Sequence, residues 1–368
     1  MLKKKYLCRR NKSKMNRLLL LFVLVMLSQT GFAQHVILVE KGSVKSLLDA
    51  FKEAAKRNND RDSERLFILI PDGYYDLGEK TLTRVAGNNV AVIGQSMKGT
   101  IIRNAPDKKI ESISRTAVLQ NRGKGNYYQD LTLKNDLDYY AAEPDGRAVC
   151  MQDKGLRTVY NRVRMLSYQD TFYSDNEKSQ HYFQDSEIHG TIDFICGAGD
   201  VWFERCLIVT EKRSRDGWGN NIIAAPRTTS DTKWGYVFNH CTIESIISDF
   251  YYARSWHTNP TCVWLYTKLM SPEKLLPDRY DPKGMKVSRC YFKEYGTTDA
   301  WGHDITPKSN LVTYTLRDNT RPFIDETIMT REELGRYHVD SVFTKWKPVE
   351  QLNELEKQSH RLKQEYFK

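Results

Sequence analysis

A three-residue pattern recurs along the middle of the chain and restricts its fold more than any other feature of the sequence. The pattern is an aromatic residue or valine, then an aliphatic residue, serine or cysteine three positions later, then a large apolar residue two positions on. Successive copies begin 32, 23, 20, 35 and 49 residues apart, which fits coils of about 20 to 25 residues with insertions. The copies are Tyr128, Leu131, Leu133; Tyr160, Val163, Met165; Phe183, Ser186, Ile188; Phe203, Cys206, Ile208; Phe238, Cys241, Ile243; and Val287, Cys290, Phe292.

This pattern predicts a β-solenoid. The segments between about residues 65 and 295 are short apolar stretches divided by Gly, Asn and Asp, and strand alternation places the last two residues of each copy on one inward side. An antiparallel sandwich is the alternative, but it would show more two-residue Asn-Gly or Asp-Gly hairpins. Cys206, Cys241 and Cys290 share one repeat position and are expected to stack as small buried residues. A disulfide stays open, although seven cysteines including Cys8 give no regular framework.

Two aspartates stand about one coil apart in the segment 168–199. Asp170 follows Gln169, and Asp193 lies in GTIDFICG. If the chain coils, these residues lie on adjacent strands about 4.8 Å apart. Two carboxylates so close cannot both ionise freely, so one should keep its proton as an acid while the other acts as a nucleophile or base. The alternative is that both face solvent at strand ends.

The charge distribution argues against nucleic acid as a partner. The formal net charge is +10, but the first 34 residues contain eight basic residues and no acidic one, and the remainder has 48 basic against 46 acidic residues. That basic start precedes an apolar run, Leu18–Leu27, and the small residues Gly31 and Ala33. Residues 1–33 are therefore expected to be a signal peptide, with an uncleaved anchor as the alternative. We expect secretion to the periplasm, cell surface or medium, and no stable membrane insertion.

Helical periodicity is confined to the two ends of the chain. An amphipathic stretch begins at Ser43 and is expected to cap the first coil. Thr330 and Glu333 predict a capping box, and Gly335 predicts that the helix it starts is short. We expect a β-solenoid catalytic domain over residues 34–330 and a helical segment over 331–368 that packs on it, although its charged end, 349–368, is equally compatible with a solvated helix.

The sequence does not predict a metal or other cofactor. The eight histidines are scattered, and neither an H-x-x-x-H pair nor a C-x-x-C motif occurs. The G-x-S-x-G elbow of serine hydrolases is also missing, since the stretch GQSMK from Gly94 lacks the final glycine.

Several ordered motifs resemble one known family, the pectin methylesterases. YQDTFY from Tyr168 and GTIDFICG from Gly190 match its two signature segments. NVAVIG and GTIIRN precede them, and GYVFNHCTIES, FYYARSW, FKEYG and TREELGRYHVDSVF follow in order, so the resemblance spans roughly residues 36 to 350. It implies an all-β, right-handed, single-stranded parallel β-helix, the pectin-lyase-like solenoid. A secreted bacterial enzyme is expected, monomeric and without cofactor, that hydrolyses galacturonate methyl esters of pectin to methanol and free carboxylate.

The resemblance also assigns roles to residues of this chain. It implies that Asp193 is the nucleophile, that Asp170 is the acid and base, and that Gln169 donates to the oxyanion. Arg254, in ARSW, would hold Asp193 ionised and oriented. Three aromatic residues match family positions that pack on sugar rings, although any one of them taken alone is more often a core residue: Trp256, Tyr251 and Tyr173.

Two positions depart from the family pattern. Arg147 replaces a second oxyanion glutamine, and its charge would either stabilise the oxyanion or pair with Asp170 and lower its pKa. Cys196 replaces an aromatic residue, which suggests a different subsite wall. The expected partner is a pectic polysaccharide of the methylated galacturonan type. The replacement at Cys196 adds the hypothesis that the substrate is a pectin other than plain methylated homogalacturonan, such as a branched rhamnogalacturonan.

Two rival functions remain open. One is a pectate or pectin lyase on the same β-helix, which would need a calcium site and an arginine or lysine base. The other is a non-catalytic polysaccharide-binding relative that Arg147 has inactivated.

Overall fold

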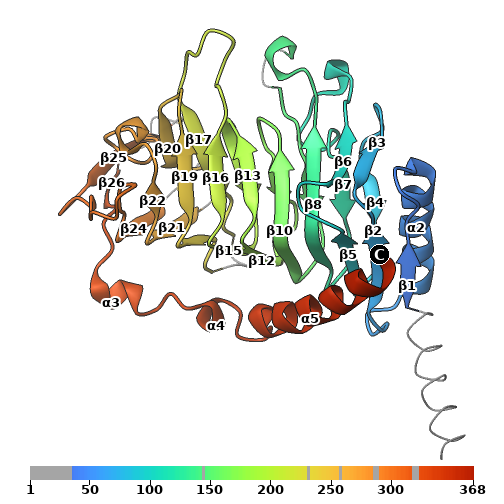
Figure 1. Ribbon diagram of the computed structural model, residues 1–368. Coiled ribbons are helices and arrows are strands. Elements are labelled where there is room, and N and C mark those ends of the chain that lie inside the picture. The colour runs from blue at the N-terminus through green and yellow to red at the C-terminus, as the bar shows by residue number, and fades with distance from the viewer. Residues whose placement is uncertain (1–34, 143–145, 230–232, 257–258, 285–289, 317–322) are drawn as a thin grey trace, which may run out of the picture.

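The computed structural model shows a parallel β-helix closed at one end by a helix and crossed on one side by a C-terminal helical tail (Figure 1). The predicted signal peptide, residues 1–33, and Val287 lie outside the described residues. The structure describes residues 35–142, 146–229, 233–256, 259–284, 290–316 and 323–368.

One large sheet winds through nearly all coils, and its strands pair in parallel with those of the next coil. Its main path is β1 (Val36–Leu38), β2 (Leu66–Ile70), β5 (Val90–Gly94), β8 (Tyr127–Asn135), β10 (Thr158–Leu166), β12 (Gln180–Gln184), β15 (Asp200–Glu204), β18 (Tyr236–Asn239), β21 (Thr261–Leu265) and β24 (Tyr291–Tyr295). The same sheet includes β3 (Gly73–Asp76), β6 (Thr100–Asn104), β13 (Glu187–Gly190), β16 (Leu207–Thr210), β19 (Thr242–Ser245) and β22 (Lys268–Leu269).

A second parallel sheet forms another face of the coil, and the predicted catalytic residues lie in or beside its strands. It contains β4 (Thr83–Val85), β7 (Leu119–Asn121), β9 (Met151–Asp153), β11 (Phe172–Ser174), β14 (Ile192–Gly197), β17 (Asn221–Pro226) and β20 (Phe250–Ala253). A small third sheet contains β23 (Lys283–Gly284), β25 (Leu311–Leu316) and β26 (Phe323–Glu326).

The repeat forms the core of the β-helix as predicted, except for its last copy. The first positions stack ring on ring along the axis from Tyr128 to Phe238, with centroids 4.3 to 5.2 Å apart. The stack continues onto Trp264, which lies 3.8 Å from Phe238. The next residue in register is Glu294, not Val287, so Cys290 does not continue the column of Cys206 and Cys241. The spacing of 49 residues contained an unrecognised coil, in which Trp264 takes the aromatic position.

The described cysteines pack as predicted and not as disulfides. All six are buried with free thiols, namely Cys150, Cys196, Cys206, Cys241, Cys262 and Cys290.

One left-handed residue per coil bends the large sheet at a corner. In β8 and β10 this residue lies inside a continuous strand, and in later coils it separates β12 from β13, β15 from β16, β18 from β19 and β21 from β22. The φ angles lie between 49° and 53°. We call these residues the corner column: Asp130, Arg162, Asp185, Arg205, His240 and Tyr266.

The N-terminal helix α2 (Val44–Arg57) covers the first coil as expected. Ser43 is its N-cap and accepts a hydrogen bond from the Ser46 backbone N–H. Its apolar side, which includes Leu47 and Phe51, is buried against the core. An apolar face and strand edges would otherwise be open at this end.

The C-terminal tail contains α3 (Arg331–Leu334), α4 (Val339–Val342) and α5 (Pro348–Tyr366). Thr330 and Glu333 form the predicted capping box, and Gly335 ends α3 after one turn. Three single turns of 3-10 helix lie in loops: η1 (Lys108–Ile110), η2 (Tyr139–Ala141) and η3 (Pro272–Lys274).

Helix α5 lies across the early coils rather than in solvent (Figure 1). Leu352, Leu355 and Leu362 pack on outward side chains of the large sheet, including Tyr127 and Val159. Because each buried leucine contributes roughly 1.5 to 3 kcal/mol, this apolar stripe accounts for the docking. The charged composition of the segment had left a solvated helix open, and the structure shows a packed one.

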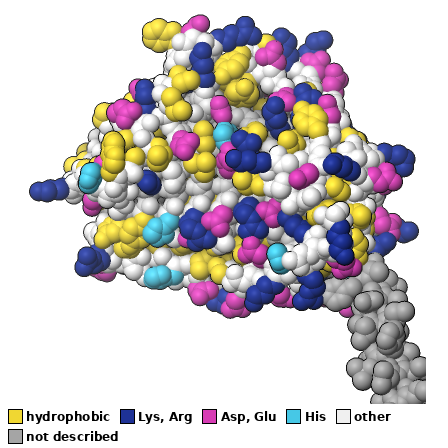
Figure 2. Space-filling model, viewed as in Figure 1, with side chains coloured by type: hydrophobic (Ala, Val, Ile, Leu, Met, Phe, Trp, Pro, Cys, Tyr) yellow, Lys and Arg dark blue, Asp and Glu magenta, His cyan; other side chains and the backbone are white. Residues whose placement is uncertain are grey.

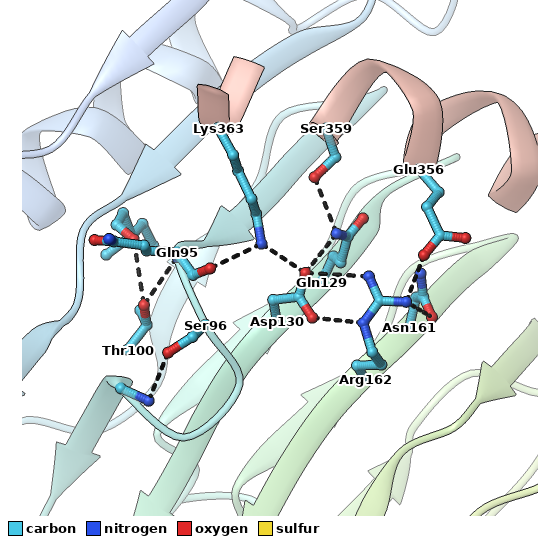
Figure 3. Close-up of polar contacts among 12 residues, drawn as sticks. Gln95, Ser96, Thr100, Gln129, Asp130, Asn161, Arg162, Glu356, Ser359 and Lys363 are labelled. Atoms are coloured by element: carbon cyan, nitrogen blue, oxygen red, sulfur yellow. Dashed lines mark hydrogen bonds and ion pairs between the residues drawn. The ribbon is translucent and has the colours of Figure 1, made fainter. Parts of the chain in front are cut away.

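A polar cluster secures the docked helix (Figure 3). Lys363 Nζ donates to Asp130 Oδ2 at 2.6 Å, and Arg162 Nε donates to Asp130 Oδ1 at 2.7 Å. Gln129 Nε2 donates to Ser359 Oγ at 2.9 Å, and Arg162 also pairs with Glu356 of α5. The corner column therefore provides the anchoring point of the tail.

Among the described residues, no helix is both long enough and apolar enough to cross a membrane.

Candidate active site

The structure places Asp170 and Asp193 on neighbouring coils at the second sheet. β11 pairs with β14 so that Phe172 lies opposite Ile195, an offset equal to the separation of the two aspartates. Both adopt the left-handed conformation, with φ of 59° for Asp170 and 50° for Asp193. This conformation is tolerated by aspartate better than by most residues, and it turns both carboxyl groups toward one cleft.

The Asp193 segment begins with Gly190, where the neighbouring atoms leave no room for a side chain. A Cβ at this position would lie 2.1 Å from the Cβ of Phe194 and 2.5 Å from the carbonyl oxygen of Tyr168. No side chain fits there, because non-bonded atoms need more than 3 Å. The close approach lets the chain turn tightly before Asp193.

Asp193 and Arg254 form the central ion pair of the site. Arg254 follows β20, and its Nη2 donates to Asp193 Oδ2. The other oxygen, Asp193 Oδ1, is buried and makes no hydrogen bond to the described residues. Burial raises the pKa of Asp193, and the charge and hydrogen bond of Arg254 oppose that rise. Asp193 thus presents one uncommitted carboxyl oxygen.

The surroundings of Asp170 favour the protonated form of its carboxyl group. Burial, followed by the charge of Asp193, raises its pKa well above the ordinary range, while Arg147 acts in the opposite direction. The thiol of Cys196 lies 3.6 Å from Asp170 Oδ1 and donates to it. The pKa values of both carboxyl groups are therefore raised, and that of Asp170 is raised well above its ordinary range.

Arg147 lies between Asp170 and a second carboxylate. Its backbone N–H donates to Glu111 Oε1 at 2.8 Å, and its guanidinium lies 3.4 Å from the same oxygen. Arg147 Nε lies 3.9 Å from Asp170 Oδ2. A parallel bridge joins Arg147 to Gln169, so these two side chains start from adjacent positions on neighbouring coils. Arg147 therefore contacts the acid and is itself partly neutralised by Glu111.

These residues line one cleft of about 320 Å³. All five predicted catalytic residues and Trp256 border it, whereas Tyr173 and Tyr251 do not. Tyr173 is close, with its ring centroid 6.5 Å from that of Trp256, and its hydroxyl donates to Asp175 at 2.9 Å. Lining residues are Ile113, Arg147, Gln169, Asp170, Asp193, Cys196, Arg254 and Trp256.

Two residues of this site have no signal in the sequence. Glu111 and Ile113 come from the irregular segment after η1, which has neither strand alternation nor a motif. Only the spatial fold brings this segment to Arg147, 36 residues further along the chain.

No cluster of three or more potential metal ligands occurs among the residues that the structure describes.

Comparisons with known proteins place the chain in a family. A family model for pectinesterases matches residues 35–297, more than half of the chain. The chain is 27% identical over 275 residues to a protein named probable pectinesterase 30 from Arabidopsis thaliana, covering 71% of this chain and 52% of that protein. It spans about half the length of the curated relatives it matches.

Solved structures agree with this assignment. The pectin methylesterase PemA from Erwinia chrysanthemi superposes with a TM-score of 0.63 at 21% identity, covering 85% of this chain and 97% of PemA. A pectin methylesterase in complex with a hexasaccharide gives a TM-score of 0.62 at 20% identity, covering 84% of this chain and 97% of that one. This likeness confirms the predicted right-handed parallel β-helix. Together with the family match over residues 35–297, it shows that the chain belongs to the pectinesterase family.

Proposed function

We propose that this chain is a pectin methylesterase that hydrolyses galacturonate methyl esters, with Asp193 as nucleophile and Asp170 as acid and base. The observation that carries the proposal is the unpartnered oxygen of Asp193, which is buried in the cleft beside a carboxyl group of strongly raised pKa. Such a pair supplies both a nucleophile and a proton donor at the same ester. Membership of the pectinesterase family supports the same reaction.

In the first half-reaction, Asp193 Oδ1 attacks the ester carbonyl carbon and forms a tetrahedral oxyanion. Gln169 forms no side-chain hydrogen bond with the described residues, so its amide protons are available to that oxyanion. Collapse breaks the carbon–oxygen bond to the methoxy group, which takes the proton of Asp170 and leaves as methanol. The products of this step are an acyl-enzyme anhydride on Asp193 and an ionised Asp170.

In the second half-reaction, Asp170 removes a proton from water, and the resulting hydroxide attacks the acyl carbon. The anhydride breaks, Asp193 leaves as a carboxylate held by Arg254, and the galacturonic acid product is released and gives its proton to solvent, which leaves galacturonate. Asp170 has regained its proton, so the site is reset without any cofactor.

Arg147 has two tasks in this proposal. Its charge limits how far the pKa of Asp170 rises, and its position beside Gln169 gives the oxyanion a cationic donor. Glu111 is a positioning residue. Its carboxylate contacts the guanidinium and the backbone N–H of Arg147 and so holds the arginine at the cleft.

The proposed substrate is a methylated pectic polysaccharide. Trp256 borders the cleft and Tyr173 lies beside it, so they could stack on consecutive sugar rings. Cys196 is smaller than the aromatic residue expected there and widens this wall, which favours a branched rhamnogalacturonan over plain homogalacturonan. Equal activity on linear pectin and on every branched pectin tested would contradict that preference.

We further propose that the enzyme acts outside the cytoplasm. The support is the basic and then apolar stretch in residues 1–33, which has the form of a signal peptide. N-terminal sequencing of the exported protein tests this, and a mature terminus near Gln34 is expected.

Methanol release from methylated pectins tests the proposed reaction, with the absorbance of unsaturated uronate followed in parallel. Methanol without unsaturated product is expected, and Asp193→Asn should lower the rate by more than about 1,000-fold. Unsaturated product would instead identify a lyase. Release of neither product from any pectin would identify a non-catalytic binding protein.

A further inference from the structure

A second groove, larger than the catalytic cleft, lies where the C-terminal tail passes the later coils. Its volume is about 630 Å³, within the range of about 300 to 1,000 Å³ typical of ligand sites. One wall is formed by outward side chains of β12, β15, β18 and β21, and the other by α3 and the residues that follow it. The lower part of this face carries hydrophobic and histidine side chains together with basic and acidic ones (Figure 2).

Two stacked rings at the end of the corner column form a platform on this groove. His240 and Tyr266 lie 4.8 Å apart with their planes 10° from parallel, and both line the groove. Tyr266 is 40% exposed although it is a large aromatic residue. Earlier members of the column are charged pairs, Arg162 with Asp130 and Arg205 with Asp185. The left-handed conformation of His240 and Tyr266 does not itself require an aromatic ring, because small polar residues adopt this conformation more readily.

The floor of the groove combines aromatic surface with planar hydrogen-bonding groups. Trp202 Nε1 donates to Glu204 Oε2 at 2.8 Å, and Asn239 Nδ2 donates to the same oxygen at 2.9 Å. Tyr182 donates to Gln184 Oε1 at 2.9 Å, while the amide NH2 of Gln184 has no partner among the described residues. Rigid aromatic rings beside fixed amides suit a pyranose ring, which has an apolar C–H face and a rim of hydroxyl groups.

One basic side chain of the groove is available to an acidic ligand. Glu204 Oε1 lies 3.3 Å from the guanidinium of Arg205, which also pairs with Asp185 at 3.0 Å. Arg331, at the start of α3, lines the groove and makes no ion pair with any described residue. Its exposed guanidinium is therefore available to a carboxylate of a bound molecule.

We propose that this groove is a non-catalytic binding site for a uronic-acid oligosaccharide. A sugar ring packs against the exposed side of the stacked pair Tyr266 and His240, Gln184 donates to a hydroxyl group, and Arg331 pairs with a uronate carboxylate. One part of this proposal rests on the proposed function, namely the source of the ligand. The esterase reaction would supply it as de-esterified stretches of the same polymer. Such a site would hold the product region of a polysaccharide while the cleft, on another face of the coil, acts on the esterified region.

Binding of unesterified tetragalacturonate to the full chain tests this, measured by calorimetry on the Asp193→Asn variant so that turnover plays no part. Two binding events per chain are expected, one in the cleft and one in the groove. Tyr266→Ala and Arg331→Gln, each made in the Asp193→Asn background, should weaken one event by about tenfold or more and leave the other unchanged.

Three controls keep the result specific. Tyr266→Phe retains the ring and should retain both events, which separates loss of the platform from misfolding. Tyr74→Ala removes an exposed tyrosine elsewhere, on β3, and Arg336→Gln removes another charge of the tail. Neither change should alter the affinity of either binding event. A single event that Tyr266→Ala does not change would overturn the proposal, as would tighter groove binding of a neutral galactan fragment. Because binding is measured without turnover, this result is independent of whether the chain releases methanol.

Discussion

The anchoring point of the tail and the candidate active site both contain buried carboxyl groups and arginines. The pKa of the carboxyl group is lowered at the anchoring point, whereas the pKa values of the two carboxyl groups in the active site are raised. The side chain of Asp130 is 12% exposed, against 6% for Asp170 and 10% for Asp193. Burial alone therefore does not distinguish them. Burial opposes ionisation of Asp130, but hydrogen bonds from Arg162 and Gln129 and the charge of Lys363 outweigh it and lower its pKa.

At the cleft, burial prevails because there are fewer cations for each carboxyl group. Arg254 bonds one oxygen of Asp193, and Arg147 is shared between Asp170 and Glu111. The pKa values of both aspartates are raised. A buried carboxylate with enough cations and hydrogen bonds around it stabilises the fold. A buried carboxylate with too few of them lowers the stability, but it is the more reactive group at a catalytic site. The following changes, from the largest expected effect to the smallest, test this contrast.

Asp170→Asn should lower methanol release by at least about 100-fold, since general acid catalysis is lost. It should also raise the free energy of unfolding at neutral pH. Asp170 has a raised folded pKa, so it costs stability once pH exceeds the unfolded pKa of about 3.9, and asparagine does not. Chemical denaturation at neutral pH and at about pH 3 measures this gain, which should vanish in acid. A variant both inactive and less stable would refute the contrast.

Asp130→Asn should have the opposite profile, with a loss of roughly 3 kcal/mol in the free energy of unfolding, because Arg162 and Lys363 both lose the carboxylate they share. The folded pKa of Asp130 is lowered, so its contribution is present above the unfolded pKa of about 3.9 and disappears as pH falls through the folded pKa. Denaturation curves of wild type and variant should therefore converge in strong acid. Methanol release per folded molecule should not change, and a loss of turnover would link the two regions.

Arg147→Gln should move the high-pH limb of the kcat profile upward by about one pH unit. Activity requires a protonated Asp170, and Arg147 holds its pKa down, so removing the charge lets this pKa rise further. Glu111→Gln is the matched control: it leaves Arg147 less neutralised and should move the limb downward. Limbs that coincide in all three proteins would show that Arg147 does not act on Asp170.

Arg205→Gln should change the free energy of unfolding by less than about 1 kcal/mol. Arg205 belongs to the corner column like Arg162 and pairs with Asp185, but half of its side chain is exposed. Arg162→Gln, measured beside it, should cost several times more. Equal losses in the free energy of unfolding for the two variants would contradict this. They would mean that a place in the corner column, and not burial under the tail, determines how much each arginine contributes to stability.

The sequence predicted the interior of the molecule well because strand alternation and coil length are local properties. Leu131, Cys206 and their counterparts face inward as the repeat required, and the offset of neighbouring coils brings Asp170 to Asp193. The prediction for the last repeat copy was wrong because an insertion hid the coil of Trp264. A spacing pattern cannot count coils across such an insertion.

The remaining parts depend on contacts between distant segments. Glu111 reaches Arg147 from an irregular loop, where no periodicity marks its position. The docking of α5 depends on outward residues such as Tyr127 and Val159, and nothing in their own strands shows what will cover them. The roles of Asp193, Asp170, Gln169 and Arg254 stay predictions, supported by the cleft in which they meet.

The position of α5 has a consequence for how the chain unfolds. A solenoid whose coils contact only their neighbours behaves as a one-dimensional array, which can lose end coils one at a time. Here the hydrogen bond between Gln129 and Ser359 joins residues separated by 230 positions, and Lys363 reaches Asp130 across 233. Early coils therefore cannot open without releasing the last residues of the chain. The tail therefore couples the opening of the early coils to the release of α5, and it can do so only after α5 has been synthesised.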